Sequence, residues 1–413
     1  MSSRMAESNY VIAVYDSPRA IDSRAWNELL AMQSDATPFM RHEYLDAMQE
    51  SDSATPSTGW TARFICLWRD EADGSGSSQP VLEAACALYL KDHSYGEYVF
   101  DHAWANAYHQ HGLAYYPKAL VAPPFTPVPG TRLLARDAGS RKALVEALIG
   151  WCREQQLSSL HVLFASDADA AACSANALML RHNVQFHWTN RAEDAGGMFA
   201  SMDAFLATLS QDKRKKIRQE RRKVADAGVS FRWGQGRSIS TADWDVFYRC
   251  YERTYYEHGN APYLTRDFFQ RMATCMPENW LLFVAERRGS PIACSLIALS
   301  DATTAPATGK VAYGRYWGAL ERVDCLHFEA CYYQPLQWCI AHGFQRFEGG
   351  AQGEHKMARA LLPVKTTSAH WLAHPAFADA VDKFLQREGR GIDNYMSELE
   401  ARNPFRAASA SQG

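Results

Sequence analysis

A nine-residue stretch from Glu348 to Lys356 gathers reactive side chains around three glycines. It contains two carboxylates, an amide, an imidazole and an ammonium, and it follows an apolar segment with helical character. Glycine lets the backbone turn tightly and approach a ligand, while glutamate, histidine and lysine move protons or hold anions. The alternative is a glycine-rich loop with a solvated, charged end. We interpret the stretch as a candidate reaction centre, because it also falls inside a repeated sequence pattern.

Five side chains are the candidate catalytic groups. His355 and Glu354 are the first base candidates, since histidine titrates near neutral pH and a carboxylate does so when burial raises its pKa. Glu348 and Glu329 are further carboxylates that can serve behind them. Lys356 is the candidate partner for negative charge that develops during a reaction.

Neighbouring residues supply the candidate contacts to a substrate. An arginine can pair with an anion and an amide can donate to a carbonyl. The predicted substrate-binding residues of this region are Arg315, Tyr316, His327, Gln352 and Gly353. His327 and Glu329 stand two apart at a predicted helix start, where the alternative role of the acid is to face the helix dipole. A metal-dependent hydrolase with ligands His327, Glu329, Glu348 and His355 is a lesser alternative, and we expect no metal because no HExxH-like spacing is present.

A basic run extends from Lys213 to Lys223 and holds eight basic side chains and one acid. Arg214, Arg218 and Arg221 share one face of the predicted helix at i, i+4 and i+7. We predict that these three arginines bind phosphate groups through bidentate contacts. A solvated helix face is the alternative.

The positioning elements are predicted from two similar halves. A hairpin with apolar arms spans 281–299, and 64–90 has the same pattern, with Ala-Cys-Ser-Leu in one return strand and Ala-Cys-Ala-Leu in the other. Tyr-Gly-x-Tyr follows in each half, at 95–98 and 313–316, and a helical stretch then ends at His-Gly. The unit is therefore strand, turn, strand, strand, helix, strand, which predicts a mixed α/β sheet of the α+β kind. We place the boundary within 190–197, giving domains 1–195 and 196–413.

The bulk composition excludes several classes of protein. At 413 residues the chain is too long for one ordinary core, and its formal charge of −3 predicts no global attraction to nucleic acid or to a membrane. No apolar run approaches the roughly 20 residues of a membrane span. Ten cysteines occur without a CxxC pair and are expected to be reduced. We expect a cytoplasmic protein that does not contact membranes.

The order of elements resembles the GNAT N-acetyltransferase fold, and two copies resemble the tandem arrangement of FemABX-type peptidyltransferases. A closer likeness, from about Phe39 to Arg406, is to a family of predicted N-acyltransferases described as peptidoglycan biosynthesis or recognition proteins. The segments that carry it are 91–101, 313–318, 326–329 and 348–356.

The resemblance implies that the fourth strand covers Ala312 to Trp317 and the fifth Arg346 to Ala351, and that the acyl donor lies where they splay apart. Acetyl-CoA-using members carry a glycine-rich pyrophosphate loop after the fourth strand. Here 318–326 has one glycine and two carboxylates instead. Fem-type transferases, which use aminoacyl-tRNA, also lack that loop, and they have a similar basic helix.

The function expected from this resemblance is transfer of an acyl or aminoacyl group to an amine. The donor is acyl-CoA or aminoacyl-tRNA, the acceptor is a small or nucleotide-linked amine, tRNA is a possible partner, and no tightly bound cofactor is expected. A non-catalytic ligand-binding protein on the same scaffold is the main alternative. The first half is expected to lend substrate contacts across a cleft through Lys118, His93, Tyr95 and Asp101.

Overall fold

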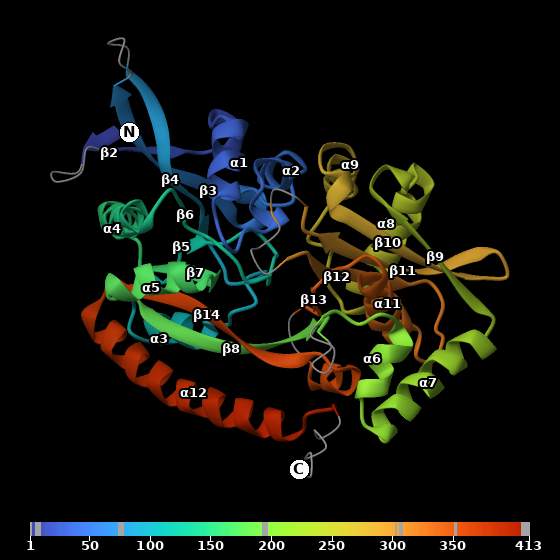
Figure 1. Ribbon diagram of the computed structural model, residues 1–413. Coiled ribbons are helices and arrows are strands. Elements are labelled where there is room, and N and C mark those ends of the chain that lie inside the picture. Colours follow the sequence, from blue (N-terminus) through green and yellow to red (C-terminus); the bar gives the residue numbers. More distant parts are fainter. Residues whose placement is uncertain are drawn as a thin grey trace.

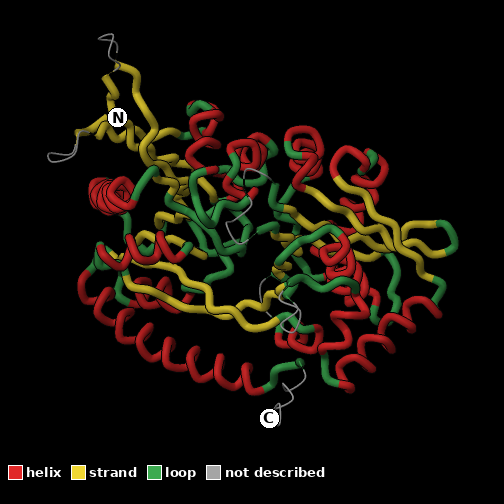
Figure 2. Tube along the Cα trace, in the orientation of Figure 1, coloured by secondary structure: helices red, strands yellow, loops and turns green. Residues whose placement is uncertain are grey.

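The fold was analysed in a computed structural model that describes residues 2–4, 10–72, 78–191, 197–301, 304, 309–350 and 353–405. One continuous mixed sheet runs through the molecule, with helices on both faces (Figure 1). The α/β class predicted from the alternation of elements is confirmed. The tube in Figure 2 shows the strands passing from one half to the other through the centre.

The N-terminal half contributes an antiparallel meander followed by a parallel pair. Strand β5 pairs antiparallel with β4 and parallel with β7, and helix α4 (Ala138–Glu154) connects β5 to β7. The strands of this half are β1 (Ser2–Arg4), β2 (Tyr10–Tyr15), β3 (Trp60–Ala72), β4 (Ser78–Lys91), β5 (Lys118–Val121), β6 (Leu134–Ala135), β7 (Ser159–Ala165) and β8 (Met179–Thr189).

The C-terminal half has the same order of pairings. Strands β9 to β12 form a meander, and β12 pairs parallel with β13 after the crossover through α11 (Gln334–Ala341). The predicted hairpin at 281–299 is confirmed as β10 and β11. The strands of this half are β9 (Val229–Gln235), β10 (Trp280–Arg287), β11 (Ser290–Leu299), β12 (Val311–Ala319), β13 (Arg346–Glu348) and β14 (Leu362–Leu372).

The two halves exchange strands at the centre of the sheet. Strand β14, late in the sequence, lies between β7 and β8 of the N-terminal half, while β8 pairs with β13 of the C-terminal half. Residues on both sides of the predicted boundary at 190–197 therefore share one set of hydrogen bonds. Helix α12 (Pro375–Ala401) follows β14 along the lower edge of the molecule (Figure 1).

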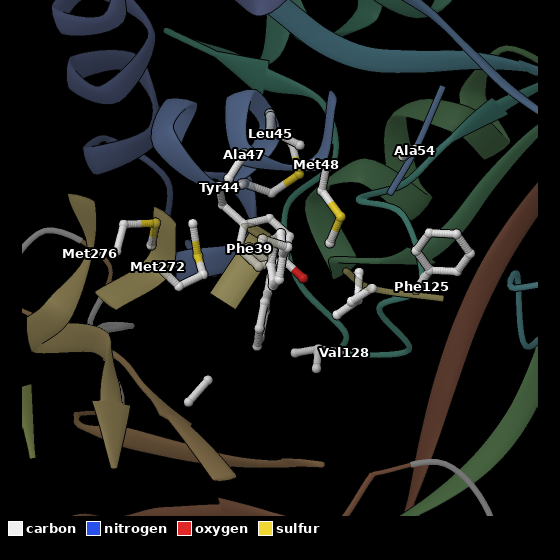
Figure 3. Packing of buried hydrophobic residues seen from close by; sticks show 14 of the residues in the cluster. Phe39, Tyr44, Leu45, Ala47, Met48, Ala54, Phe125, Val128, Met272 and Met276 are labelled. Atoms are coloured by element: carbon white, nitrogen blue, oxygen red, sulfur yellow. The ribbon is translucent and has the colours of Figure 1, made fainter. Parts of the chain in front are cut away.

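Helices from both halves share one core on one face of the sheet. The cluster includes Trp26 of α1 (Ser23–Ala31), Tyr44 of α2 (His42–Glu50), Phe247 of α8 (Thr241–Glu257) and Phe269 of α9 (Arg266–Cys275). The aromatic side chain of Tyr44 packs against that of Phe268, with 5.5 Å between ring centroids. Figure 3 shows Tyr44 of α2 together with Met272 and Met276, which come from the C-terminal half. The remaining helices are α3 (His102–Gln110), α5 (Asp167–Ala175), α6 (Met202–Thr208), α7 (Gln211–Asp226) and α10 (Leu326–Phe328).

One part of the predicted repeat is wrong. Residues 95–98 form no strand, because Gly96 and Tyr98 have φ of 81° and 64° and turn the chain in a loop before α3. By its pairings, β5 is the counterpart of β12, and α4 is the counterpart of α11. The sequence motifs of the two halves match, but the third strand of the N-terminal half is β5, which begins about twenty residues after the predicted strand at 95–98. The predicted fourth strand, Ala312 to Trp317, lies within β12, whereas the fifth strand ends at Glu348.

All ten cysteines are free thiols. Within the described ranges, no helix combines the length and the apolar character needed to span a membrane.

The strand exchange predicts how fragments behave. Residues 1–195 alone lack β14, so β7 and β8 lose the strand that lies between them, and unpaired edges favour aggregation. We expect this fragment to be insoluble or unfolded alone and to recover native-like circular dichroism when co-expressed with 196–413. A fragment that is folded and monomeric by itself would contradict the exchange.

Candidate active site between β12 and β13

Strands β12 and β13 separate after a short parallel contact. They pair only from Val311 opposite Arg346 to Tyr313 opposite Glu348, and β12 then continues to Ala319 without that partner. On its other edge β12 has a bulge opposite Leu296 and Ile297, so that Arg315 is an extra residue without a Cα partner on β11. The bulge and the separation open a V-shaped gap between the two strands.

A cavity of about 250 Å³ occupies this gap. Its wall combines the bulged part of β12, the glycine backbone after β13, the segment around η7 (Glu329–Tyr333), and residues of the N-terminal half. Side chains and backbone of the following residues line it: Tyr98, Pro127, Tyr255, Ser295, Ile297, Gly314, Arg315, Tyr316, Trp317, His327, Cys331, Tyr332, Gly349 and Gly350. The predicted residues Arg315, Tyr316 and His327 thus meet at one cavity.

Two titratable side chains, His327 and Tyr332, line the cavity side by side, with their ring centroids 5.7 Å apart. Burial lowers the pKa of His327 to about 4, with His355, Arg359 and Lys356 adding to the shift. The imidazole is therefore neutral at pH 7 and able to accept a hydrogen bond. Burial also raises the pKa of Tyr332 well above 10, so that its hydroxyl stays protonated and can donate.

His355 stands directly behind this tyrosine. Its Nε2 lies 3.2 Å from the hydroxyl oxygen of Tyr332, and partial burial lowers the pKa of its imidazole. His355 itself is exposed and does not line the cavity. The pair connects solvent to the cavity through one tyrosine hydroxyl.

Lys356 is buried beneath the glycine backbone. Its Nζ donates to the carbonyl oxygen of Gly350 at 2.9 Å, and burial lowers its pKa to about 8. A Cβ atom on Gly349 would lie 2.5 Å from Leu361 Cδ2 and 3.3 Å from Lys356 Cδ, so a larger residue there would displace these side chains. The ammonium is therefore held against backbone that lines the cavity.

The three predicted carboxylates lie apart from one another and do not line the cavity. Glu348 is buried and accepts from Arg346 Nε at 3.0 Å, and burial raises its pKa to about 7. Glu329 accepts from Arg221 at 3.2 Å. Glu354 turns outward to α12, where Tyr395 donates to it at 2.7 Å.

The four residues that the metal-hydrolase alternative requires are likewise not gathered. In the part of the chain that the structure describes, no three His, Cys, Asp or Glu side chains form a group suited to a metal ion. Gln352 lies outside the described residues, and Gly353, with φ of 116°, precedes the short helix η8 (Glu354–Arg359).

Lys118 and Asp101 are part of a different, closed cluster. Lys118 is fully buried at the start of β5, and its Nζ donates to Glu97 at 2.7 Å and to Asp101. The lysine holds the pKa of Asp101 well below its usual range despite burial, which acts in the opposite direction. Asp101 also accepts from the hydroxyl of Tyr115 at 2.6 Å. These partners leave the lysine no path to a substrate in the cleft.

His93 and Tyr95 line a second hollow of about 400 Å³ between the halves, together with Phe125 and Tyr263, whose rings stack at 4.7 Å. Tyr95 is 65% exposed there. The first half therefore meets the second near the candidate site through these residues and not through Lys118.

The basic run forms helix α7, whose two faces differ. Arg214 and Arg218 lie on an open surface with Lys215 and Arg222. Arg221 instead faces Glu329, with 3.1 Å between the closest nitrogen and oxygen atoms. The three predicted phosphate ligands thus divide into Arg214 and Arg218, which line this open surface, and Arg221, which forms an ion pair with the buried Glu329.

Sequence reasoning missed Tyr332 as a cavity residue, and it missed Arg359 and Glu220 altogether. Tyr332 lies in a π-helical turn, which shifts the phase of the helix so that 3.6-residue periodicity gives the wrong face. Glu220 had one available signal, because it is the only acid in the basic run.

The chain shares the fold of the C-terminal domain of a proposed lysylphosphatidylglycerol synthetase from Agrobacterium fabrum. That structure superposes with a TM-score of 0.50 at 10% identity, over 87% of this chain and 94% of the other. L-PGS from Bacillus licheniformis aligns with a TM-score of 0.46 at 10% identity, over 77% and 89%. A tandem GNAT protein from the clavulanic acid biosynthesis pathway aligns with a TM-score of 0.40 at 12% identity, over 88% and 99%. No curated protein matches the sequence.

The likeness to the first of these structures shows a shared fold, and the family follows from the sequence. The chain belongs to the FemAB-like family, described as peptidoglycan biosynthesis/recognition, whose model matches residues 17–407. The resemblance found in the sequence segments is thereby confirmed. Family and fold point to a transferase, and they leave the transferred group open.

Replacing Lys118 with methionine separates a structural from a substrate-binding role. The change leaves Glu97 and Asp101 buried without their cation, which costs about 3–5 kcal/mol of unfolding free energy. Chemical denaturation of Lys118→Met should show this loss, with Lys142→Met, an exposed lysine, as control. Unchanged stability would contradict the structural role.

Proposed function

We propose that the protein transfers an acyl or aminoacyl group to an amine in the cavity between β12 and β13. The observation that carries the proposal is the meeting of a neutral imidazole, a protonated phenol and glycine backbone in that cavity. Amine acylation needs a proton acceptor for the nucleophile, a proton donor for the leaving group, and donors for the oxyanion.

The proposed reaction proceeds through a tetrahedral intermediate. The amine nitrogen forms a bond to the acyl carbonyl carbon and gives up a proton to His327. Backbone N–H groups at the β12 bulge, and the charge of Lys356 behind Gly350, stabilise the oxyanion. The bond between the acyl carbon and the donor oxygen or sulfur then breaks, and Tyr332 protonates the leaving group. His355 reprotonates Tyr332 through their contact.

Two features favour an aminoacyl-tRNA donor over acetyl-CoA. The turn after β12 carries Glu321 and Asp324, which repel a pyrophosphate where acetyl-CoA enzymes bind one. The exposed face of α7 presents Arg214, Lys215 and Arg218, which can contact a phosphate backbone. The family description supports a peptidoglycan-type or nucleotide-linked amine as acceptor.

A donor and acceptor screen tests the proposal. Purified protein is incubated with a pool of radiolabelled aminoacyl-tRNA or with a panel of coenzyme A thioesters, each with uridine-diphosphate-linked peptide amines, and transfer of label is measured. We expect transfer from charged tRNA and none from acetyl-CoA. Binding without turnover under all conditions would favour the ligand-binding alternative.

Tyr332→Phe should reduce turnover by about 100-fold, because the leaving group loses its proton donor. The binding constant for the donor should change little, since the ring remains. Tyr256→Phe is the matched control, because Tyr256 is exposed and does not line the cavity. Turnover of Tyr332→Phe equal to wild type would remove this residue from the mechanism.

The pH dependence should report Lys356. Its pKa of about 8 means that the ammonium loses its proton as pH rises through 8, and the oxyanion then loses a stabilising charge. Turnover should therefore fall above about pH 8, and Lys356→Met should lower turnover and abolish this limb. A basic limb that persists in Lys356→Met would assign it to another group.

A further inference from the structure

The only acid of the basic run, Glu220, points into the protein from α7. Its side chain is buried, with 7% exposure. The hydroxyl of Tyr333 and Nη2 of Arg359 both donate to its Oε2, the latter at 2.8 Å. Glu220 is therefore a buried carboxylate that contacts η7, which lines the cavity, and η8, whose His355 contacts Tyr332 of the cavity wall.

Arg359 extends this connection to the candidate reaction centre. It is 2% exposed, its Nη1 donates to the carbonyl oxygen of His355 at 2.7 Å, and its guanidinium lies 3.5 Å from the ring centroid of Phe328. Phe328 belongs to α10, the element that also carries His327. Residues of α7, η8 and α10 thus meet at Arg359, and Glu220 fixes its charged end.

The contacts end at Tyr332 and His355, two of the three residues assigned to proton transfer. Tyr333 is the neighbour of Tyr332 in the same π-helical turn, and Arg359 holds the backbone of His355, whose ring contacts Tyr332. A shift of Glu220 would therefore act on both partners of the Tyr332–His355 contact.

The stability of the fold does not explain why a charged residue is buried at position 220. A buried ion pair loses solvation that its attraction only partly restores, and apolar residues of similar size are often at least as stable. The surrounding core offers such a setting, since Ile217 and Val224 of α7 are buried on the same side. The carboxylate of Glu220 accepts hydrogen bonds from Tyr333 and Arg359, and we infer that its role is to hold these two side chains in place.

We propose that Glu220 is a positioning residue for acyl transfer, which holds Arg359 and Tyr333 so that His355 keeps its contact with Tyr332. The proposal rests on the proposed function for its catalytic consequence. Its structural consequence is measurable without any substrate.

The test compares Glu220→Gln and Glu220→Ala with wild type by side-chain ¹⁵N NMR of histidine, with the His355 signal assigned by His355→Gln. The charged and titratable groups around His355 are Arg359 and Lys356 of η8, His327 of α10, Tyr332 of η7, and Glu354, which is held by Tyr395 and Arg402 of α12. In Glu220→Ala, Arg359 loses its buried partner, so the pKa of His355 should differ from that of wild type and its signal should broaden.

Glu220→Gln keeps an acceptor oxygen and should stay closer to wild type. Asp226→Asn, at an exposed acid of the same helix, is the control and should leave the His355 titration unchanged. Once a donor is identified, Glu220→Ala should lower kcat at least tenfold with KM within twofold.

The outcomes separate the two proposals. A wild-type His355 titration in folded Glu220→Ala overturns the positioning role, whatever the activity. A shifted titration together with a wild-type enzyme that shows no turnover supports the positioning role and overturns the proposed function. If Glu220→Ala does not fold, Glu220→Leu, which fills the space but accepts no hydrogen bond from Arg359 or Tyr333, decides by the same measurement.

Discussion

The antiparallel pairing of β8 with β14 is the constraint on which the rest of the structure depends. Each strand comes from one half of the chain and completes the sheet of the other half. Because β8 holds the far edge of β13, the near edge of β13 is free to leave β12 after only three residue pairs. The cavity exists at the point of that divergence, and a change that disrupts the central pair would also affect the cavity.

The β5–β7 pair of the N-terminal half corresponds to the β12–β13 pair of the C-terminal half, but the two pairs differ in whether a gap stays open beside them. After β5 the N-terminal chain returns to β7, where Gly130 bonds to Phe164 and Arg132 Nε donates to the carbonyl of Leu163 at 2.8 Å. That return closes the gap which stays open between β12 and β13. The N-terminal half instead buries its charges in the Lys118 cluster and contributes Tyr98 and Pro127 to the cavity wall. The cavity between β12 and β13 is therefore lined by residues of both halves.

Burial sets the chemistry available in that cavity. It keeps the imidazole of His327 neutral, the hydroxyl of Tyr332 protonated and the pKa of Lys356 near 8. Each shift follows from the cost of placing a charge where water is excluded. One face of helix α7 carries arginines on the open surface. The other face contacts the segments around the cavity through Glu220 and Arg221.

The sequence by itself determined the family, the mixed α/β class and the hairpin at 281–299, because local periodicity and short motifs survive in any context. Tertiary structure decided which of the predicted side chains meet. Glu354 and Lys118 carry suitable groups, yet one turns to α12 and the other is enclosed by two carboxylates. Tyr332 reaches the site region because it lies in a π-helical turn, and Arg359 because a buried carboxylate of α7 orients it. Neither effect can be predicted from the spacing of residues along the chain.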